Sequence, residues 1–167
     1  MPSRLLGKPT HLDPDFGYLT YGDQSQRGNR INGLLGSGDF LAFFAGLRPV
    51  DELSQRLIYA LIGLYVIEEI IPAKSVPRSC WNENAHTRCE PGDSDIVVRA
   101  RSGVSGRLRH CIAIGEYRNR AYRVRTDLLD TWGGLDINDG YIQRTYICPH
   151  SKTRTNSTHG FSPRNLN

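Results

Sequence analysis

The chain has 167 residues, a hydrophobic fraction of 38% and 17 glycines, which predict one domain with a real core and many turns. No run approaches the roughly 18 apolar residues of a membrane span, and the N-terminus lacks the apolar region of a signal peptide, so we expect a cytoplasmic protein without membrane contact. The formal net charge of +4 and the pI near 9.0 favour a polyanionic partner.

The basic residues are nearly all arginine, because lysine occurs only at Lys8, Lys74 and Lys152. The planar guanidinium grips phosphates and base edges with two hydrogen bonds and stacks on bases, which lysine cannot do. Nucleic acid is therefore the expected partner. Heat adaptation of a thermophile, or a GC-rich genome, would also explain the arginine excess.

In chain order, residues 1–10 read as a short arm and residues 11–38 as loops with at most one helical turn, because glycines are dense there. Residues 40–46 form an apolar strand in which Phe43 and Phe44 point to opposite faces. Residues 56–71 supply one long or two short strands, since β-branched and aromatic residues dominate. Residues 78–94 form a polar insert that could begin a helix.

Further strands are predicted at residues 96–101, 108–114, 121–125 and 141–147, with a turn at 102–107 and a helix at 127–132 that Thr126 caps. The sum is an α+β fold with about five to seven short strands in a small mixed or antiparallel, barrel-like sheet and a few short helices. We expect a single domain over residues 1–150 and a polar tail over residues 151–167.

Four cysteines without a signal peptide favour free thiols and a reducing compartment. The principal expectation is no metal site. Zinc held by Cys80, His86 and Cys89, with Cys148 and His150 as a further pair, stays open as an alternative because the ligand types fit although the spacing does not. A Cys80–Cys89 disulfide is another alternative.

A histidine and several carboxylates near the start of the chain are candidate catalytic groups. Alternation along an extended segment would put His11, Asp13 and Asp15 on one face, where they could act as general base, orienting acid or cation ligand, with Asp23 completing the set. Asp-Pro-Asp is also ordinary turn chemistry, in which a carboxylate caps its own backbone. Both interpretations stay open.

Candidate nucleic-acid contacts are arginines interleaved with aromatic rings. One loop places Tyr21 beside Arg27 and Arg30, and the strand after it carries Phe44 and ends near Arg48. Two basic hairpins follow, in which the candidates are Arg107, Arg109 and Arg123. Salt bridges on solvated faces would give the same pattern.

The segments His11–Asp15, Tyr21–Asp23 and Gly38–Arg48 together resemble the third nucleotide modification associated domain family. The later segments 95–98, 105–108 and 112–115 also fit, so the resemblance covers roughly residues 11–150. It implies a role in systems that modify or recognise altered bases in DNA, so the resemblance favours DNA over RNA as the partner. At the level of the fold alone, the chain is also similar to PUA and EVE domains, which read bases.

The sequence thus predicts a nucleic-acid-binding domain for recognition or modification of altered DNA or RNA bases. An enzyme that acts on a nucleotide or modified base through the His/Asp set is the alternative, and a protein-interaction module is the third. Whether the chain is an enzyme stays open, and the sequence indicates no particular cofactor.

Overall fold

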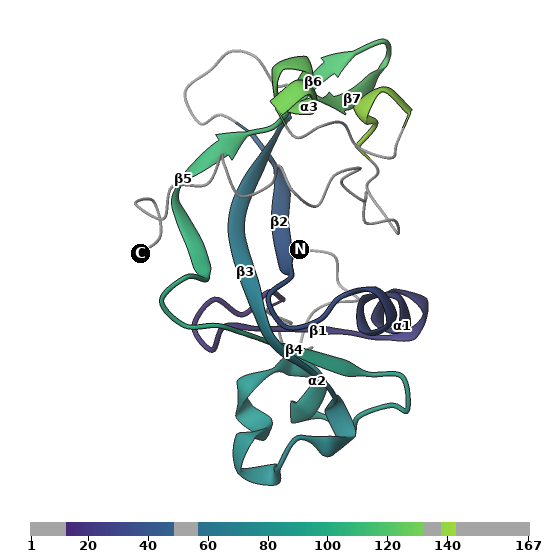
Figure 1. Cartoon of the computed structure of the whole chain (residues 1–167), viewed down its shortest axis with the longest axis vertical. Helices are drawn as coiled ribbons and strands as arrows, with labels where there is room; N and C mark the ends of the chain where they lie inside the picture. Colours follow the sequence, from purple (N-terminus) through teal and green to yellow (C-terminus); the bar gives the residue numbers. More distant parts are fainter. Residues whose placement is uncertain (1–12, 49–56, 132–137, 143–167) are drawn as a thin grey trace, which may run out of the picture. The chain divides into compact units, whose positions relative to one another are not determined.

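A computed structural model describes residues 13–48, 57–131 and 138–142 (Figure 1). The chain divides into two compact units, which we call unit 1 (residues 1–39 and 66–101) and unit 2 (residues 40–65 and 102–167). The long strand β3 (Ile58–Pro72) contributes its first part to unit 2 and its last part to unit 1. The single domain expected over residues 1–150 stays a prediction.

Unit 1 contains two further strands and several short helices. They are β1 (Thr20–Asp23), α1 (Ser25–Leu34), η2 (Ala73–Ser75), η3 (Arg78–Glu83), α2 (Ala85–Arg88) and β4 (Ile96–Ala100). Strand β4 lies between β1 and β3 and pairs antiparallel with both. It is the central strand of this unit, which explains why it is apolar and why Val97 and Val98 are fully buried.

Helix α1 contradicts the prediction of loops over residues 11–38. Gly28 counted as a helix breaker in the sequence, but it lies on the buried face of α1 beside Ile31. A Cβ at Gly28 would lie 3.1 Å from the carbonyl oxygen of Ser94 and 3.2 Å from that of Asp23. Glycine is needed here because the helix approaches its neighbours closely, so its presence marks packing rather than a turn.

Unit 2 contains β2 (Phe40–Leu47), β5 (Gly106–Ala113), β6 (Gly115–Arg118), β7 (Ala121–Val124), α3 (Thr126–Thr131) and η4 (Asn138–Gly140). Here β3 lies between β2 and β5, and β6 and β7 form a separate antiparallel hairpin. Residues from several strands make one buried apolar cluster, namely Tyr59, Leu61, Leu108, Ile114, Val124 and Ile142.

Most of the predicted elements are confirmed. Strands occupy the stretches predicted around residues 40–46, 56–71, 96–101, 108–114 and 121–125, and β3 is one strand rather than two. The α+β class with antiparallel pairing and short helices is confirmed. Two register shifts, at Leu61/Gly63 and Ile67/Glu69, interrupt the ladders of β3. Such irregularities bend a strand, so they favour the curled sheet that the barrel-like prediction requires.

Three outcomes differ or lie outside the described residues. Strand β6 was not predicted. The strand predicted at 141–147 falls mostly outside the described residues, although Tyr141 forms an isolated bridge with Arg123. The expected arm and tail also lie outside. None of the helices in the described part of the chain has the length and apolar character needed to cross a bilayer.

Candidate active site

Side chains from five segments of unit 1 gather around Gly22 in β1. Asp13 comes from the loop before β1, and Tyr21 and Asp23 flank Gly22 within the strand. The others are Arg27 in α1, His86 in α2, and Asp95, which immediately precedes β4. We call these six residues the Gly22 cluster.

Asp13 is tied to the strand through its carboxylate. The N–H of Gly22 donates a hydrogen bond of 3.0 Å to Asp13 Oδ1. Burial raises the pKa of Asp13 to about 6, and the nearby charge of Asp23 acts in the same direction. The Gly22 N–H, His86 and Arg27 oppose this shift of the pKa without cancelling it. Asp13 therefore takes up and releases a proton close to neutral pH.

His86 is held in place by its backbone and by its ring. Its N–H donates to Asn84 Oδ1 at 2.9 Å, and the fully buried Asn84 in turn donates to Thr20 Oγ1 at 3.1 Å. The ring atom Nδ1 lies 3.4 Å from Asp95 Oδ2, and the two side chains are only 11% and 12% exposed. A carboxylate facing Nδ1 orients an imidazole and sets its tautomer, as in many catalytic histidines.

Gly22 itself is a spatial requirement of the cluster. A Cβ at this position would lie 2.2 Å from His86 Cδ2 and 2.4 Å from Asn84 Oδ1. The imidazole therefore packs directly on the backbone of β1. This contact explains why the strand carries glycine between Tyr21 and Asp23, although glycine weakens strands.

Asp23 is a buried carboxylate with three donors. It is 3% exposed, and its Oδ1 accepts from the N–H of Gln24 at 2.8 Å. Its Oδ2 accepts from the Tyr21 hydroxyl and lies against Arg27 Nε, one turn into α1. Burial and the hydrogen bond to Asp23 raise the pKa of Tyr21, so its hydroxyl stays protonated. Arg27 is thus a cation fixed at the edge of the cluster, with its side chain more than half exposed.

The predicted catalytic residues divide among three situations. Asp13 and Asp23 belong to the Gly22 cluster. Asp15 caps its own turn, because its Oδ1 accepts from the N–H groups of Gly17 and Tyr18 at 2.9 and 3.1 Å. His11 lies outside the described residues.

The sequence interpretation missed the pairing of His86 with Asp95, which now supplies the histidine of the site. His86 had been considered only as a zinc ligand, and Asp95 only as part of a strand. The one sequence signal for Asp95 is its position immediately before the apolar strand β4, where a strand end can present a carboxylate.

The zinc ligand set is not assembled among the described residues, which contain no group of three metal-type side chains. Cys80 packs against the apolar cluster of Ala73, Val76 and Val97. Cys80 and Cys89 are free thiols, so the alternative of a disulfide between them is wrong. Cys148 and His150 lie outside the described residues.

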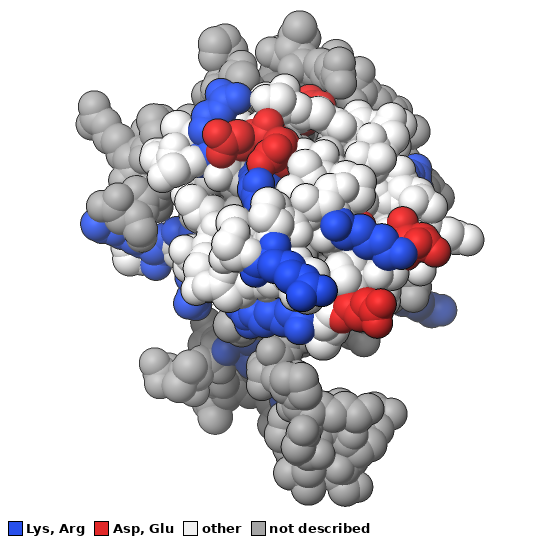
Figure 2. Space-filling model, turned by 90° about the horizontal axis from the view of Figure 1, so that it is seen from below, with Lys and Arg blue, Asp and Glu red and all other residues white. Residues whose placement is uncertain are grey.

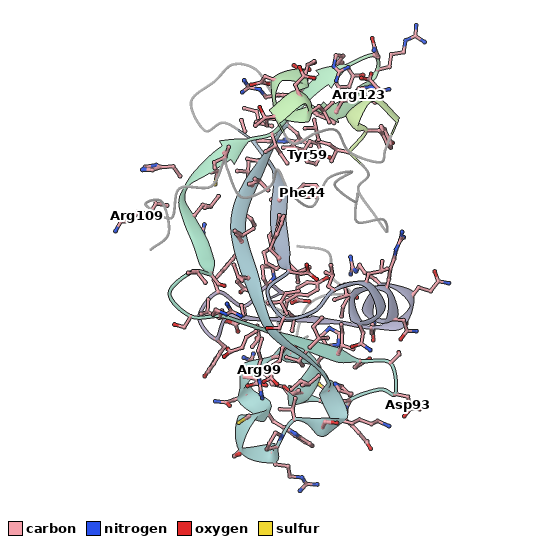
Figure 3. All side chains as sticks on the ribbon, viewed as in Figure 1. Phe44, Tyr59, Asp93, Arg99, Arg109 and Arg123 are labelled. Carbon is pink, nitrogen blue, oxygen red and sulfur yellow. The ribbon has the colours of Figure 1, made fainter. Side chains whose placement is uncertain are left out.

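The predicted nucleic-acid contacts are spread over both units. In unit 1, Tyr21 turns its hydroxyl to Asp23 and Arg27 is anchored by the same carboxylate, while Arg30 is exposed on α1. In unit 2, three arginines are exposed on or after strands, namely Arg48, Arg107 and Arg109, and Figure 3 shows Arg109 extending away from β5.

Two predicted contacts of unit 2 are engaged with neighbours. Phe44 meets Tyr59 edge to face with ring centroids 6.1 Å apart, yet stays 42% exposed (Figure 3). Arg123 donates from Nη1 to the carbonyl oxygen of Asp139 at 3.3 Å and lies over the ring of Tyr141 at 5.9 Å.

The charges of the two units differ in sign. The described residues of unit 1 hold seven Lys or Arg and ten Asp or Glu, whereas those of unit 2 hold seven Arg and four Asp or Glu. On the face viewed in Figure 2, basic side chains lie next to acidic ones. Within unit 1, Arg99 bonds Glu69 at 2.7 Å and Glu83 at 2.8 Å.

Comparison with known proteins gives one match. A family model described as nucleotide modification associated domain 3 matches residues 3–133, which is most of the chain. No curated protein and no solved structure matches, so the expected similarity to PUA and EVE domains has no support from solved structures. The chain belongs to the nucleotide modification associated domain 3 family.

Proposed function

We propose that the protein is an enzyme that acts on a nucleotide or nucleobase through general acid–base catalysis at the Gly22 cluster. The observation that carries the proposal is the convergence of Asp13 and the His86–Asp95 pair on one strand residue, Gly22. A carboxyl group whose pKa lies near neutral pH, together with an imidazole oriented by a second carboxylate, is a usual combination in such a site.

Asp13 is the proposed proton-transferring group. A general base works best when its pKa lies near the working pH, and burial brings the pKa of Asp13 to about 6. At neutral pH the carboxylate is mostly ionised and accepts a proton from the substrate. His86 is the second group, oriented by Asp95 so that its ring keeps one position during the reaction.

The nucleotide class of substrate is supported by the family description and by Arg27. The Nε atom of Arg27 is anchored on Asp23, and its exposed side chain leaves room for an anion at the edge of the cluster. A guanidinium binds phosphate oxygens in a fork geometry. Arg27 would therefore hold a nucleotide phosphate while the buried carboxylate and imidazole face the base.

The test is product formation by Asp13→Asn against the matched control Asp93→Asn. The amide oxygen of the first variant still accepts from Gly22 N–H, so the fold is kept. Asp93 is an exposed carboxylate of the same unit, and among the described residues its ion-pair partner is Lys74 (Figure 3). Deoxynucleoside monophosphates and short DNA strands with unmodified and modified bases are incubated with each protein, and masses are measured.

We expect a mass change with the wild-type protein and Asp93→Asn, and a rate lower by about 10²–10⁴-fold with Asp13→Asn, the range for losing a general base. Equal rates for the Asp13→Asn and Asp93→Asn variants would contradict the role of Asp13. No mass change with any substrate would contradict the enzyme proposal itself.

We propose, as a second candidate, a nucleic-acid-binding domain that recognises altered bases, with DNA favoured over RNA. It is supported by strand β5 and its flanks, because residues 102–115 contain no carboxylate while Arg107 and Arg109 are exposed. The pairing of β5 with β3 also shifts register between the paired positions Arg107 and Ile112. A bulge redirects side chains out of the ladder, as at many binding sites.

Salt dependence tests this second candidate. Binding through arginine and phosphate releases counterions, so log affinity falls steeply with log salt concentration. We expect such a slope by fluorescence anisotropy with labelled DNA, and a shallower or weaker response with RNA of the same sequence. An affinity that does not change with salt would contradict it, and no retention on either nucleic acid would favour a protein-interaction module.

A further inference from the structure

Four aromatic rings of unit 2 form a continuous row from β2 to β6. Phe44 meets Tyr59 at 6.1 Å between centroids, Tyr59 meets Tyr122 at 4.8 Å, and Tyr122 meets Tyr117 at 5.3 Å. Every contact is edge to face, with interplanar angles of 60° to 68°. We call Phe44, Tyr59, Tyr122 and Tyr117 the ring row.

The ring row is buried in its middle and exposed at its two ends. Tyr59 belongs to the buried apolar cluster and is 6% exposed, whereas Phe44 and Tyr117 are 42% and 52% exposed. Aromatic side chains with an exposed ring are enriched at binding surfaces. The ends are held in place by the packed middle, so exposed ring faces are available at a low cost in conformational entropy.

The hairpin that carries Tyr117 is joined to its neighbours by strand pairing and by an ion pair. Tyr117 pairs directly with Tyr122 across β6 and β7. Arg118 donates from Nη1 to both carboxylate oxygens of Asp139, at 2.7 and 2.8 Å, and so ties η4 to the hairpin. These contacts hold the backbone of the hairpin next to η4.

The charge around the ring row favours an anionic partner with flat rings. Unit 2 has three more arginines than carboxylates among its described residues. Arg120 is exposed in the turn of the hairpin, three residues from Tyr117, with no carboxylate partner within the described part of the unit. Exposed aromatic rings next to cations are how proteins bind single-stranded nucleic acid, because every base has a face that stacks.

We propose that the exposed ends of the ring row stack on unpaired nucleobases, so that unit 2 binds single-stranded nucleic acid in preference to duplex. The inference rests on the second function proposed above and specifies its ligand. Duplex bases are already stacked on one another and offer no face to Tyr117 or Phe44. A strand with splayed bases does, and its phosphates can lie against arginines such as Arg120.

Fluorescence anisotropy with a labelled single strand and the matching duplex tests the proposal. Tyr117→Ala removes one stacking ring and Tyr117→Phe keeps it. Tyr18→Ala is the matched control, because Tyr18 is 53% exposed and lies in unit 1. Phe44→Leu, which keeps apolar volume but loses the ring, carries the test if Tyr117→Ala lowers the melting temperature so far that the protein is unfolded.

We expect tighter binding to the single strand than to the duplex, and a loss of about 5- to 150-fold for Tyr117→Ala or Phe44→Leu, the range for one base stack. Tyr117→Phe, which keeps the ring, should bind more tightly than Tyr117→Ala, and Tyr18→Ala should bind as wild type. Single-strand binding that persists unchanged in Tyr117→Ala and Phe44→Leu overturns the ring row as a stacking surface, and so does equal affinity for the duplex. Absence of binding to either nucleic acid overturns the second proposed function itself.

Discussion

Replacement of Gly22 by alanine should disrupt the candidate active site more than the same replacement at any other described glycine of unit 1. The new Cβ would lie 2.2 Å from His86 Cδ2, whereas carbon atoms in contact are about 3.5–4.0 Å apart. The imidazole would therefore have to retreat by more than about 1 Å. Asn84 Oδ1, at 2.4 Å from the same Cβ, blocks a small local adjustment.

The consequence is both energetic and functional. Overpacking of this kind costs about 1–3 kcal/mol of unfolding free energy. The His86 Nδ1 to Asp95 Oδ2 distance is already 3.4 Å, so a displaced ring loses this partner and its orientation. Activity should fall together with stability, since His86 is the second proton-transferring group of the proposed enzyme.

Gly33→Ala is the matched control. Gly33 lies on the exposed side of α1, and nothing lies within 4 Å of a Cβ built there. Alanine at this position should raise stability by about 0.5–1 kcal/mol, because glycine is the poorer helix former. Urea unfolding and product formation are measured for both variants. A Gly22→Ala protein as stable and as active as Gly33→Ala would refute the packing argument.

Three further predictions concern the same units. The pKa of Asp13 is about 6 in the folded protein and about 3.9 in the unfolded chain. The folded state therefore binds the proton more tightly, and the unfolding free energy should fall as pH rises from about 4 to about 6. The urea midpoint of the wild-type protein should fall over this pH range, and that of Asp13→Asn should fall less. An equal fall of the two midpoints with pH would contradict the raised pKa. Tyr21→Phe should lower the unfolding free energy measured in urea by about 1–3 kcal/mol, because the buried Asp23 loses a hydrogen-bond donor. Tyr18→Phe, on the surface, should change the unfolding free energy little. Equal effects of the two replacements would refute the role of the Tyr21 hydroxyl. Arg107→Gln should reduce the slope of log affinity for DNA against log salt concentration by about 1. Arg125→Gln should leave this slope unchanged, because Arg125 is paired with Asp127. Identical slopes for the two variants in anisotropy titrations would show that Arg107 does not contact DNA.

The strands of this fold could be predicted from the sequence, because their residue types strongly favour strand over helix or turn. Ile96–Ala100 and Ile58–Pro72 are rich in β-branched and aromatic residues, and both became strands. Helix α1 could not be predicted in the same way. Gly28 allows α1 to pack closely against backbone oxygens, and the sequence does not distinguish this role from that of a residue that ends a helix.

The site was only half predictable for a similar reason. Asp13 and Asp23 were named because their types and spacing fit acid–base chemistry. The partnership of His86 with Asp95 depends on how the insert folds back over β1, and the space that Gly22 leaves for the ring appears only in three dimensions. Long-range approach of this kind leaves no periodicity in the sequence.

The pH dependence of product formation is the most direct test of the Gly22 cluster as an acid–base site. If Asp13 accepts a proton from the substrate, the rate rises with pH through an apparent pKa of about 6 and reaches a plateau above it. Asp93→Asn should follow the same curve, and Asp13→Asn should lose the rise. A rate that is independent of pH between 5 and 8, or a rise that persists in Asp13→Asn, would contradict the account.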